Sequence, residues 1–230
     1  MGCDIHMVIE VRPLDSDRWV LHGEPTRDNS DPEYPSLDMP EPYSGRNYNL
    51  FAVLADVRNG YGFAGVDTGD RIEPVSLPRG IPEDASPEYA EWAKGWDVDG
   101  HSHSWLTLAE LLAYDWTRPK TSRGWLTMKE YAKWVSWGKS RGEQPEGWCG
   151  GVSGGAVRHV SNKDADALIA GRFWNDIPKE LDSTYTQCEW TVPLVKTIGP
   201  DLFAEVIAPM LALSQTHGQD GVRIVFFFDN

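Results

Sequence analysis

The sequence is poor in basic residues and in cysteine, and it has no long apolar stretch. Lysine and arginine number 21 against 35 aspartate and glutamate residues, so the formal net charge is −14. Proteins that bind DNA or RNA concentrate basic residues to neutralise phosphates. We therefore expect neither nucleic acid nor an anionic membrane surface as a partner. A small anionic ligand is compatible with this charge, because one local pocket can oppose it.

Cysteine is present only as Cys3, Cys149 and Cys188, which is too sparse for a disulfide framework. The opening segment MGCDIHMVIE has neither the basic stretch nor the apolar run of a signal peptide. No stretch approaches the roughly 18 apolar residues of a membrane span, so we expect no membrane partner. A reducing, cytoplasmic location fits these features.

What is present is an ordinary globular composition with a surplus of tryptophan. The chain has 230 residues, 40% hydrophobic and 24% charged, and predicts a single globular domain over residues 1–230. The eleven Trp residues suit a core and pockets for flat ligands. They would also suit an interface between copies, which leaves a homo-oligomer open.

Apolar periodicity and capping residues predict the elements of the fold. We expect strands over 3–11, 18–22, 156–160, 184–192 and 222–230, and helices over 47–57, 86–95 and 200–216, with further helices beginning at Thr107, Thr127 and Ser161. Residues 23–46 and 96–105 are predicted as loops. The class is therefore α+β: a mixed or antiparallel sheet that includes both terminal strands, with packed helices and long loops rich in Pro and Gly. The apolar terminal strand is expected at its centre.

The first candidate site is Asp4-Ile-His6 on the opening strand. Side chains two residues apart on a strand share a face. Asp and His are good ligands for Zn, Mn or Fe and also a good acid–base pair. The alternative is an edge pair that is satisfied by local hydrogen bonds.

The second candidate is DVDGHSHS, residues 97–104, which holds two of the six histidines of the chain. An H-x-H spacing lets His101 and His103 reach one ion when the backbone is extended, with Asp99 beside them. The alternative is a solvent-facing turn that leads into the next helix.

Arg46-Asn47-Tyr48 is the third candidate, because an Arg at a helix N-terminus favours an anion. A capping segment with a surface Arg is the alternative. Trp105, next to the His pair, offers a flat face on which a base can stack.

Two resemblances add to these patterns. Asp4-Ile-His6, Gly69-Asp70 and Gly100-His101-Ser102-His103 resemble fragments of the calcineurin-like metallophosphoesterase signature, although the Gly-Asn-His block of that family is missing between Asp70 and Gly100. The resemblance implies two metals that activate water against a phosphoester.

Over most of its length the chain is similar to a protein family seen in bacteriophages and actinobacteria. The segments that carry the likeness include MGCDIHMVIEV, GRNYNLFAVLADVRNG, DGHSHSWLTLAELLAYDW and VRIVFFFDN. This resemblance implies a phage accessory role, such as counter-defence against a nucleotide immune signal, in the host cytoplasm.

Together these patterns predict a metal-dependent hydrolase of a small phosphorylated or nucleotide substrate. A divalent ion, Zn or Mn, would be held by Asp4, His6, His101 and His103, and Asp70 or Asp99 would complete the shell or act as base. Arg46, Asn47, Tyr48 and Trp105 would bind the ligand. The alternative is a non-catalytic protein that uses the same residues to sequester a small nucleotide messenger. Whether the two His-containing segments meet in space is left open.

Overall fold

The computed structural model describes residues 2–28, 30 and 36–229. The chain forms two compact units. The first comprises Met1–Asn59, Glu73–Asp115 and Ile198–Asn230, and the second comprises Gly60–Ile72 and Trp116–Thr197. The single domain that the sequence suggests stays a prediction, because two compact units can belong to one domain or to two.

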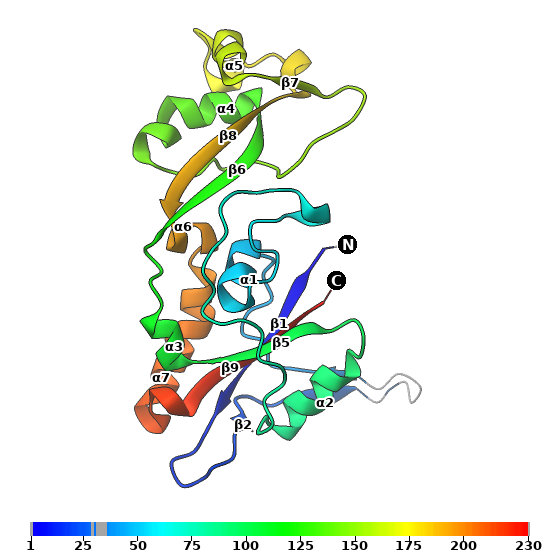
Figure 1. Cartoon of the computed structure of the whole chain (residues 1–230), viewed down its shortest axis with the longest axis vertical. Helices are drawn as coiled ribbons and strands as arrows, with labels where there is room; N and C mark the ends of the chain where they lie inside the picture. Colours follow the sequence, from blue (N-terminus) through cyan, green and yellow to red (C-terminus); the bar gives the residue numbers. More distant parts are fainter. Residues whose placement is uncertain (1, 29, 31–35, 230) are drawn as a thin grey trace. The chain divides into compact units, whose positions relative to one another are not determined.

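The first unit is built on a four-stranded sheet of order β2-β1-β9-β5 with antiparallel neighbours (Figure 1). Its strands are β1 (Asp4–Val11), β2 (Val20–Leu21), β5 (His101–Thr107) and β9 (Val222–Asp229). The two terminal strands pair along their whole length, from Asp4 opposite Asp229 to Val11 opposite Val222. The α+β class, the sheet that includes both terminal strands and the central place of the last strand are therefore confirmed.

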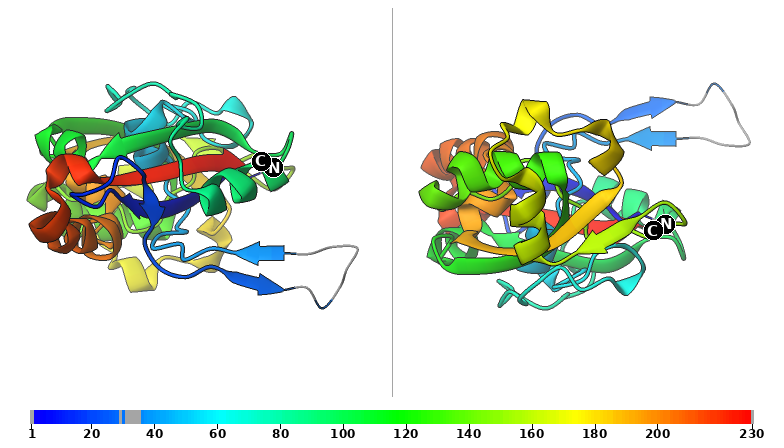
Figure 2. Two further views of the ribbon diagram at one scale, coloured as in Figure 1. Left: turned by 90° about the horizontal axis from the view of Figure 1, so that it is seen from below. Right: turned by 90° about the horizontal axis from the view of Figure 1, so that it is seen from above.

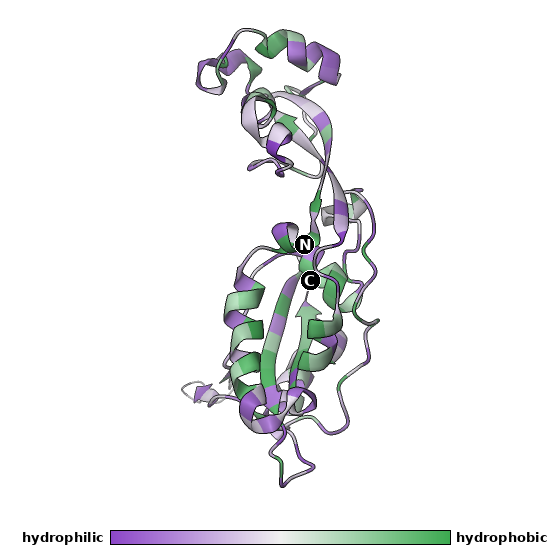
Figure 3. Ribbon diagram, turned by 90° about the vertical axis from the view of Figure 1, so that its left-hand side faces the viewer, coloured by the Kyte–Doolittle hydropathy of each residue, from purple (hydrophilic) through white to green (hydrophobic). Residues whose placement is uncertain are grey.

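Helices cover both faces of this sheet. They are α1 (Tyr48–Ala55), α2 (Pro87–Gly95), α3 (Leu108–Ala113) and α7 (Ala208–His217), with a π-helical turn, Leu202–Ile207, before α7. The ring of Phe51 on α1 lies 5.0 Å from Phe228, whereas Tyr89 on α2 packs with Phe227. Because Phe227 and Phe228 are consecutive on β9, α1 and α2 lie on opposite faces. Figure 3 shows hydrophobic colour gathered on this sheet and on the helix sides that meet it.

Local sequence sets the helix ends, as the capping signals predict. Asn47 caps α1 by accepting hydrogen bonds from the N–H groups of Asn49 and Leu50. Ser86 caps α2 with Pro87 in its first turn. Thr107 and Glu110 form a reciprocal capping box at α3.

Two predicted loops are partly wrong. The segment 23–46 contains an antiparallel hairpin of β3 (Thr26–Asp28) and β4 (Ser36–Asp38), which projects from the first unit in Figure 2. The segment 96–105 becomes strand β5 from His101 onward. Its polar residues hide the strand signal, because only Ser104 and Leu106 are buried before the helix begins.

The second unit has a three-stranded sheet of order β6-β8-β7, formed by β6 (Pro119–Thr127), β7 (Arg158–Val160) and β8 (Thr184–Pro193). Its helices are α4 (Met128–Lys133), α5 (Asn162–Ile169) and α6 (Leu194–Ile198), the last of which leads back to the first unit. A π-helical turn, Trp134–Gly138, extends α4. Short 3-10 turns in the two units span Phe63–Gly65, Lys139–Arg141, Trp174–Asp176, Lys179–Leu181 and Gln219–Gly221. None of the helices in the described ranges combines the length and apolar character that a membrane span needs.

Candidate functional site

One face of the terminal-strand pair carries the candidate site. Alternate residues of β1 and β9 point to this face, and they form the cross-strand pairs Asp4–Asp229, His6–Phe227, Val8–Val225 and Glu10–Arg223. The middle of the face is apolar and buried under α2, whereas charged pairs stand at both ends. The strand alternation that places Asp4 and His6 on one face is therefore realised.

Asp4 is bound by Arg46. The Arg46 Nε donates to Asp4 Oδ1 at 2.7 Å, and its Nη2 donates to Asp4 Oδ2. This two-pronged contact lowers the pKa of the Asp4 carboxyl. Both side chains remain about half exposed, at 40% for Asp4 and 53% for Arg46, so the pair is open to exchange with solvent or ligand.

His6 lies between two carboxylates. Its Nδ1 is 3.0 Å from Glu41 Oε1, and its Nε2 is 3.5 Å from Asp229 Oδ2 without hydrogen-bond geometry. Burial lowers the pKa of the imidazole, but the hydrogen bond that the ring donates to Glu41 and the charges of Glu41 and Asp229 outweigh it, so the pKa of His6 is raised. The Nε2 atom is buried and has no hydrogen-bond partner in the described part of the chain.

Aromatic rings surround this imidazole. Trp96 lies 4.3 Å from it, Phe227 stacks on it at 4.9 Å, and Trp92 meets it edge-on at 5.6 Å. Trp92 and Trp96 are four residues apart on and just after α2, so both fall on the side that covers the sheet. The rings fix the orientation of His6 and exclude water from its buried nitrogen.

His101 and His103 do not act as a pair. An extra residue in β5 shifts the register between His101 and Ser104, and Ser102 adopts a left-handed φ of 52° within this bulge. His101 therefore stacks on Phe228, whereas His103 packs against Phe227, which points to the other face. Burial and the nearby His101 lower the pKa of His103. The extended backbone that an H-x-H metal site requires is absent from this segment.

His6 and His103 both touch Phe227, but from the strands on either side of β9. The ring centroid of Phe227 lies 4.9 Å from that of His6 and 5.0 Å from that of His103. Among residues 2–28, 30 and 36–229, no three His, Cys, Asp or Glu side chains are arranged to hold one metal ion.

The other predicted residues have structural partners. Besides capping α1, Asn47 donates from its side chain to the carbonyl of Ile198. The Tyr48 hydroxyl accepts from the N–H of Cys3. Trp105 lies at the opposite end of the face, beneath the guanidinium of Arg79.

The two predicted catalytic acids are also placed. Asp99 is an exposed residue in the turn after α2, where its N–H donates to the Trp96 carbonyl. Asp70 belongs to the second unit, where its N–H donates to the Thr121 carbonyl.

Sequence reasoning missed Glu41 and Asp229. Glu41 is one acid among many in a Pro-rich segment, and nothing local distinguishes it. Asp229 is the polar end of an apolar strand, and its place beside His6 follows from pairing between the two ends of the chain. The i, i+4 spacing of Trp92 and Trp96 was a signal that could have identified these two rings beside His6, called the aromatic wall below.

A comparison of the chain with models of known protein families, with curated proteins and with solved structures finds no match. The two resemblances therefore stay predictions, and the function of the site has to be argued from its own geometry.

Proposed function

We propose that the protein is a metal-dependent hydrolase of a small phosphorylated or nucleotide substrate, with the ion held by His6 and Asp229 and completed by Asp4. This ligand set keeps the Asp4 and His6 of the sequence prediction and replaces His101 and His103 by Asp229. All three side chains come from one face of the β1–β9 pair.

The observation that carries this proposal is the 3.5 Å separation between His6 Nε2 and Asp229 Oδ2. Two bonds of about 2.0–2.2 Å to a tetrahedral ion place the ligand atoms about 3.4 Å apart. A buried imidazole nitrogen without a hydrogen-bond partner is costly. An ion between the two atoms would remove that cost.

Glu41 fits the role of a supporting carboxylate. Imidazoles that bind metals usually donate their other N–H to a carboxylate, which fixes the tautomer and the orientation of the ring. Glu41 Oε1 occupies this position at Nδ1 of His6, 3.0 Å away. Nε2 is thereby left with a lone pair that faces Asp229.

Arg46 couples the third ligand to the substrate. It holds Asp4, which stands directly opposite Asp229 in the strand register. A substrate phosphate would compete for the guanidinium, because Arg binds phosphate with the same two-pronged geometry as carboxylate. Asp4 would then be released to turn toward the ion. A divalent ion in this position supplies a Lewis acid for phosphoryl transfer to water.

The test is to measure bound metal after incubation of the full chain with Zn²⁺ or Mn²⁺ and removal of free ion. We expect about one equivalent for the wild type and a near-complete loss for His6→Ala and for Asp229→Ala. The control is the double variant His101→Ala/His103→Ala, which removes two imidazoles from the same unit and is expected to retain the ion. Loss of metal in the control, or near-zero metal in every protein, contradicts the proposed site.

The aromatic wall favours a second candidate, a binding protein that sequesters a small nucleotide without a metal. The partly exposed Trp92 and Trp96 give flat surfaces, and Arg46 gives a cation for phosphate. Incubation with cyclic and ADP-ribose-type nucleotides, followed by denaturation and chromatography, separates the two functions. Cleaved ligand that depends on Asp229 supports the hydrolase, whereas ligand recovered intact supports sequestration.

A further inference from the structure

The contact between Arg46 and Asp4 occupies a carboxylate that a bound ion would need. The guanidinium donates from Nε to Asp4 Oδ1 at 2.7 Å and from Nη2 to Asp4 Oδ2, so both oxygens of Asp4 accept from one side chain. Gly2 lies so close to this guanidinium that a Cβ there would come within 2.7 Å of the Arg46 Cζ. The missing side chain at Gly2 therefore leaves room for Arg46 in its present position.

Asp229, in contrast, is already turned toward His6. Its Oδ1 accepts a hydrogen bond from the Asp4 N–H at 3.0 Å, and its Oδ2 lies 3.5 Å from His6 Nε2. Asp4 stands directly opposite Asp229 in the strand register. The two carboxylates therefore share one sheet face, and the guanidinium binds the one that does not yet face His6.

Separation of Arg46 from Asp4 has an electrostatic cost when no ion is bound. Two like charges directly opposite each other on neighbouring strands are destabilising. A phosphate that took the guanidinium would expose Asp4 to Asp229 and would bring further negative charge to the same place. A divalent ion at His6 and Asp229 offsets this cost, because it gives the released Asp4 carboxylate a new partner.

The same exchange operates in the other direction. An ion that draws Asp4 toward Asp229 leaves the Arg46 guanidinium without its carboxylate. A free guanidinium matches a phosphate with two parallel hydrogen bonds. Each ligand therefore removes the obstacle to the binding of the other.

We propose that the site binds its divalent ion and its phosphorylated substrate cooperatively, with the Arg46–Asp4 pair as the switch that couples them. This inference rests on the proposed metal site, and it adds that each ligand binds more weakly when it is alone. Linkage requires that the ion and the phosphate strengthen each other by the same factor, and such coupling is typically about 5–150-fold. The consequence for a hydrolase is that the ion gains its third ligand when a substrate is present.

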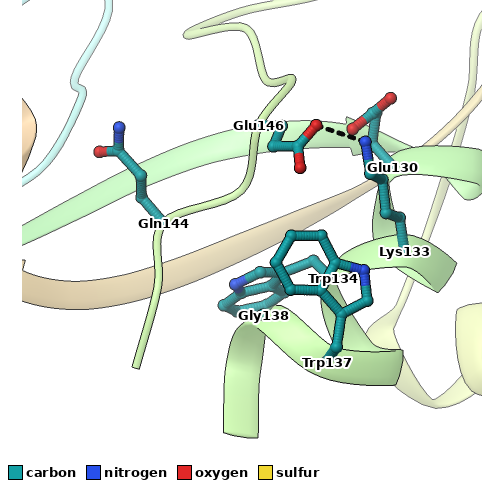
Figure 4. A pocket seen from close by; sticks show the side chains of 7 residues that line it. All are labelled: Glu130, Lys133, Trp134, Trp137, Gly138, Gln144 and Glu146. Atoms are coloured by element: carbon teal, nitrogen blue, oxygen red, sulfur yellow. Dashed lines mark hydrogen bonds and ion pairs between the residues drawn. The ribbon is translucent and has the colours of Figure 1, made fainter. Parts of the chain in front are cut away.

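A lysine pair in the second unit has no space for such an exchange. Lys133 pairs with Glu146 beside the Trp134 and Trp137 rings, as Figure 4 shows. The hollow at this pair has room for about one water molecule, which is too little for a phosphate group. A lysine also presents a point charge and not the planar fork that matches phosphate.

Arg27 and Glu91 provide a matched control in the first unit. Arg27 donates two hydrogen bonds of 2.6 Å to the two carboxylate oxygens of Glu91. The two side chains are 50% and 54% exposed, close to the values for Arg46 and Asp4. Glu91 lies on α2 and is not opposite Asp229, so removal of Arg27 changes an exposed pair of the same geometry without touching the proposed switch.

The experiment is a titration of the full chain with Mn²⁺, with and without inorganic phosphate, in which electron paramagnetic resonance measures the free ion. For the wild type we expect phosphate to lower the apparent dissociation constant of Mn²⁺ by at least about fivefold. Arg46→Met should bind Mn²⁺ without phosphate at least as tightly as the wild type, because Asp4 is then free from the start. Phosphate should change the affinity of this variant by less than about twofold. Arg27→Met should respond to phosphate as the wild type does.

The outcomes distinguish this proposal from the metal site on which it rests. Mn²⁺ binding that is lost in Asp229→Ala but does not respond to phosphate overturns the coupling and supports the metal site. An equal response in the wild type and in Arg46→Met also overturns the coupling, because the phosphate then binds the ion without Arg46. The absence of bound Mn²⁺ in every protein, with and without phosphate, overturns both.

A second measurement tests the coupling even if Arg46→Met disturbs folding, which circular dichroism would detect. Phosphate binding to the wild type is measured by calorimetry with and without Mn²⁺. The dissociation constant of phosphate should decrease by the same factor as that of Mn²⁺. A phosphate affinity that Mn²⁺ leaves unchanged overturns the proposal.

Discussion

The two ends of the β1–β9 face both carry charged side chains but have opposite environments. At one end Glu10 stands opposite Arg223, and at the other Asp4 stands opposite Asp229. Val8 and Val225 lie between them, fully buried. On one sheet face, the comparison distinguishes charged residues that stabilise the fold from charged residues that are available to a ligand.

The Arg223 end is closed. Arg223 and Glu10 are 2% and 0% exposed, and their atoms approach to 2.7 Å. Arg223 also donates to Asp84, Glu10 accepts from the N–H of Ser86, and the guanidinium lies 4.0 Å from the Trp19 ring. The charges of Arg223 and Glu10 are thus both buried and paired.

The His6 end is open and incompletely satisfied. Its side chains are 16% to 53% exposed, and three carboxylates, those of Asp4, Glu41 and Asp229, stand near one imidazole and one guanidinium. The His6 Nε2 has no hydrogen-bond partner in the described ranges. Polar atoms without hydrogen-bond partners contribute little to stability, and they are typical of a binding site.

The largest effect is expected from Arg223→Met. This change leaves the buried Glu10 carboxylate without its guanidinium, and the loss of one partner from a buried pair costs about 3–5 kcal/mol. Urea denaturation should show that decrease in the free energy of unfolding.

The matched control is Arg46→Met, the same substitution at the open end, which is expected to leave the unfolding midpoint unchanged. Equal losses in the two variants would remove the distinction between the two ends.

Much of the first unit could be predicted from local sequence. Period-2 alternation gave β1, and Asn47, Ser86 and Thr107 marked three helix starts. Strand β6 was missed because its buried face carries Lys120, Ser122 and Gly124 before Leu126. The buried Lys120 amine donates to the Thr121 carbonyl, and burial lowers its pKa. Such a strand has no apolar alternation to detect.

The candidate site was only half predictable. Asp4 and His6 share a strand, and their common face follows from the geometry of that strand. Asp229 reaches them through the register of strands about 225 residues apart in sequence. The bulge at Ser102 separates His101 from His103, and no local pattern announces the left-handed residue that produces it.

A smaller effect on stability, one that depends on pH, is expected near the closed end. Near the closed end, Glu110 accepts from Arg79, which also covers Trp105. Burial raises the pKa of Glu110, but the bonds from Arg79 and Thr107 outweigh it, so the pKa is lowered overall. A lowered carboxyl pKa gives stability that is present above the unfolded value, about 4.3, and is lost as pH falls through the folded value.

We therefore expect Glu110→Gln to be less stable than the wild type at pH 6, by up to about 1 kcal/mol for this partly exposed pair. The difference in the free energy of unfolding between the variant and the wild type, measured by urea denaturation, should decrease from pH 5 to pH 3. A gap that stays constant over this range would mean that the Glu110 charge contributes nothing.

The smallest effect on stability is expected at the open end, for Asp229→Asn in protein stripped of metal. The substitution removes an attraction to His6 and also a repulsion from Asp4, which faces it across the strands. Cross-strand charge pairs contribute roughly 0.2–1 kcal/mol each, so the two changes nearly cancel. Asn can still accept the hydrogen bond from the Asp4 N–H.

The free energy of unfolding should therefore change by less than about 0.5 kcal/mol. Added Zn²⁺ should stabilise the wild type and not the variant, because only an ion that binds the folded state shifts the unfolding equilibrium. A variant that loses stability as Arg223→Met does would mean that Asp229 supports the fold. A variant that Zn²⁺ stabilises as much as the wild type would mean that the ion lies elsewhere. If the site serves a ligand and not the fold, the variant should keep its full stability and lose the response to Zn²⁺.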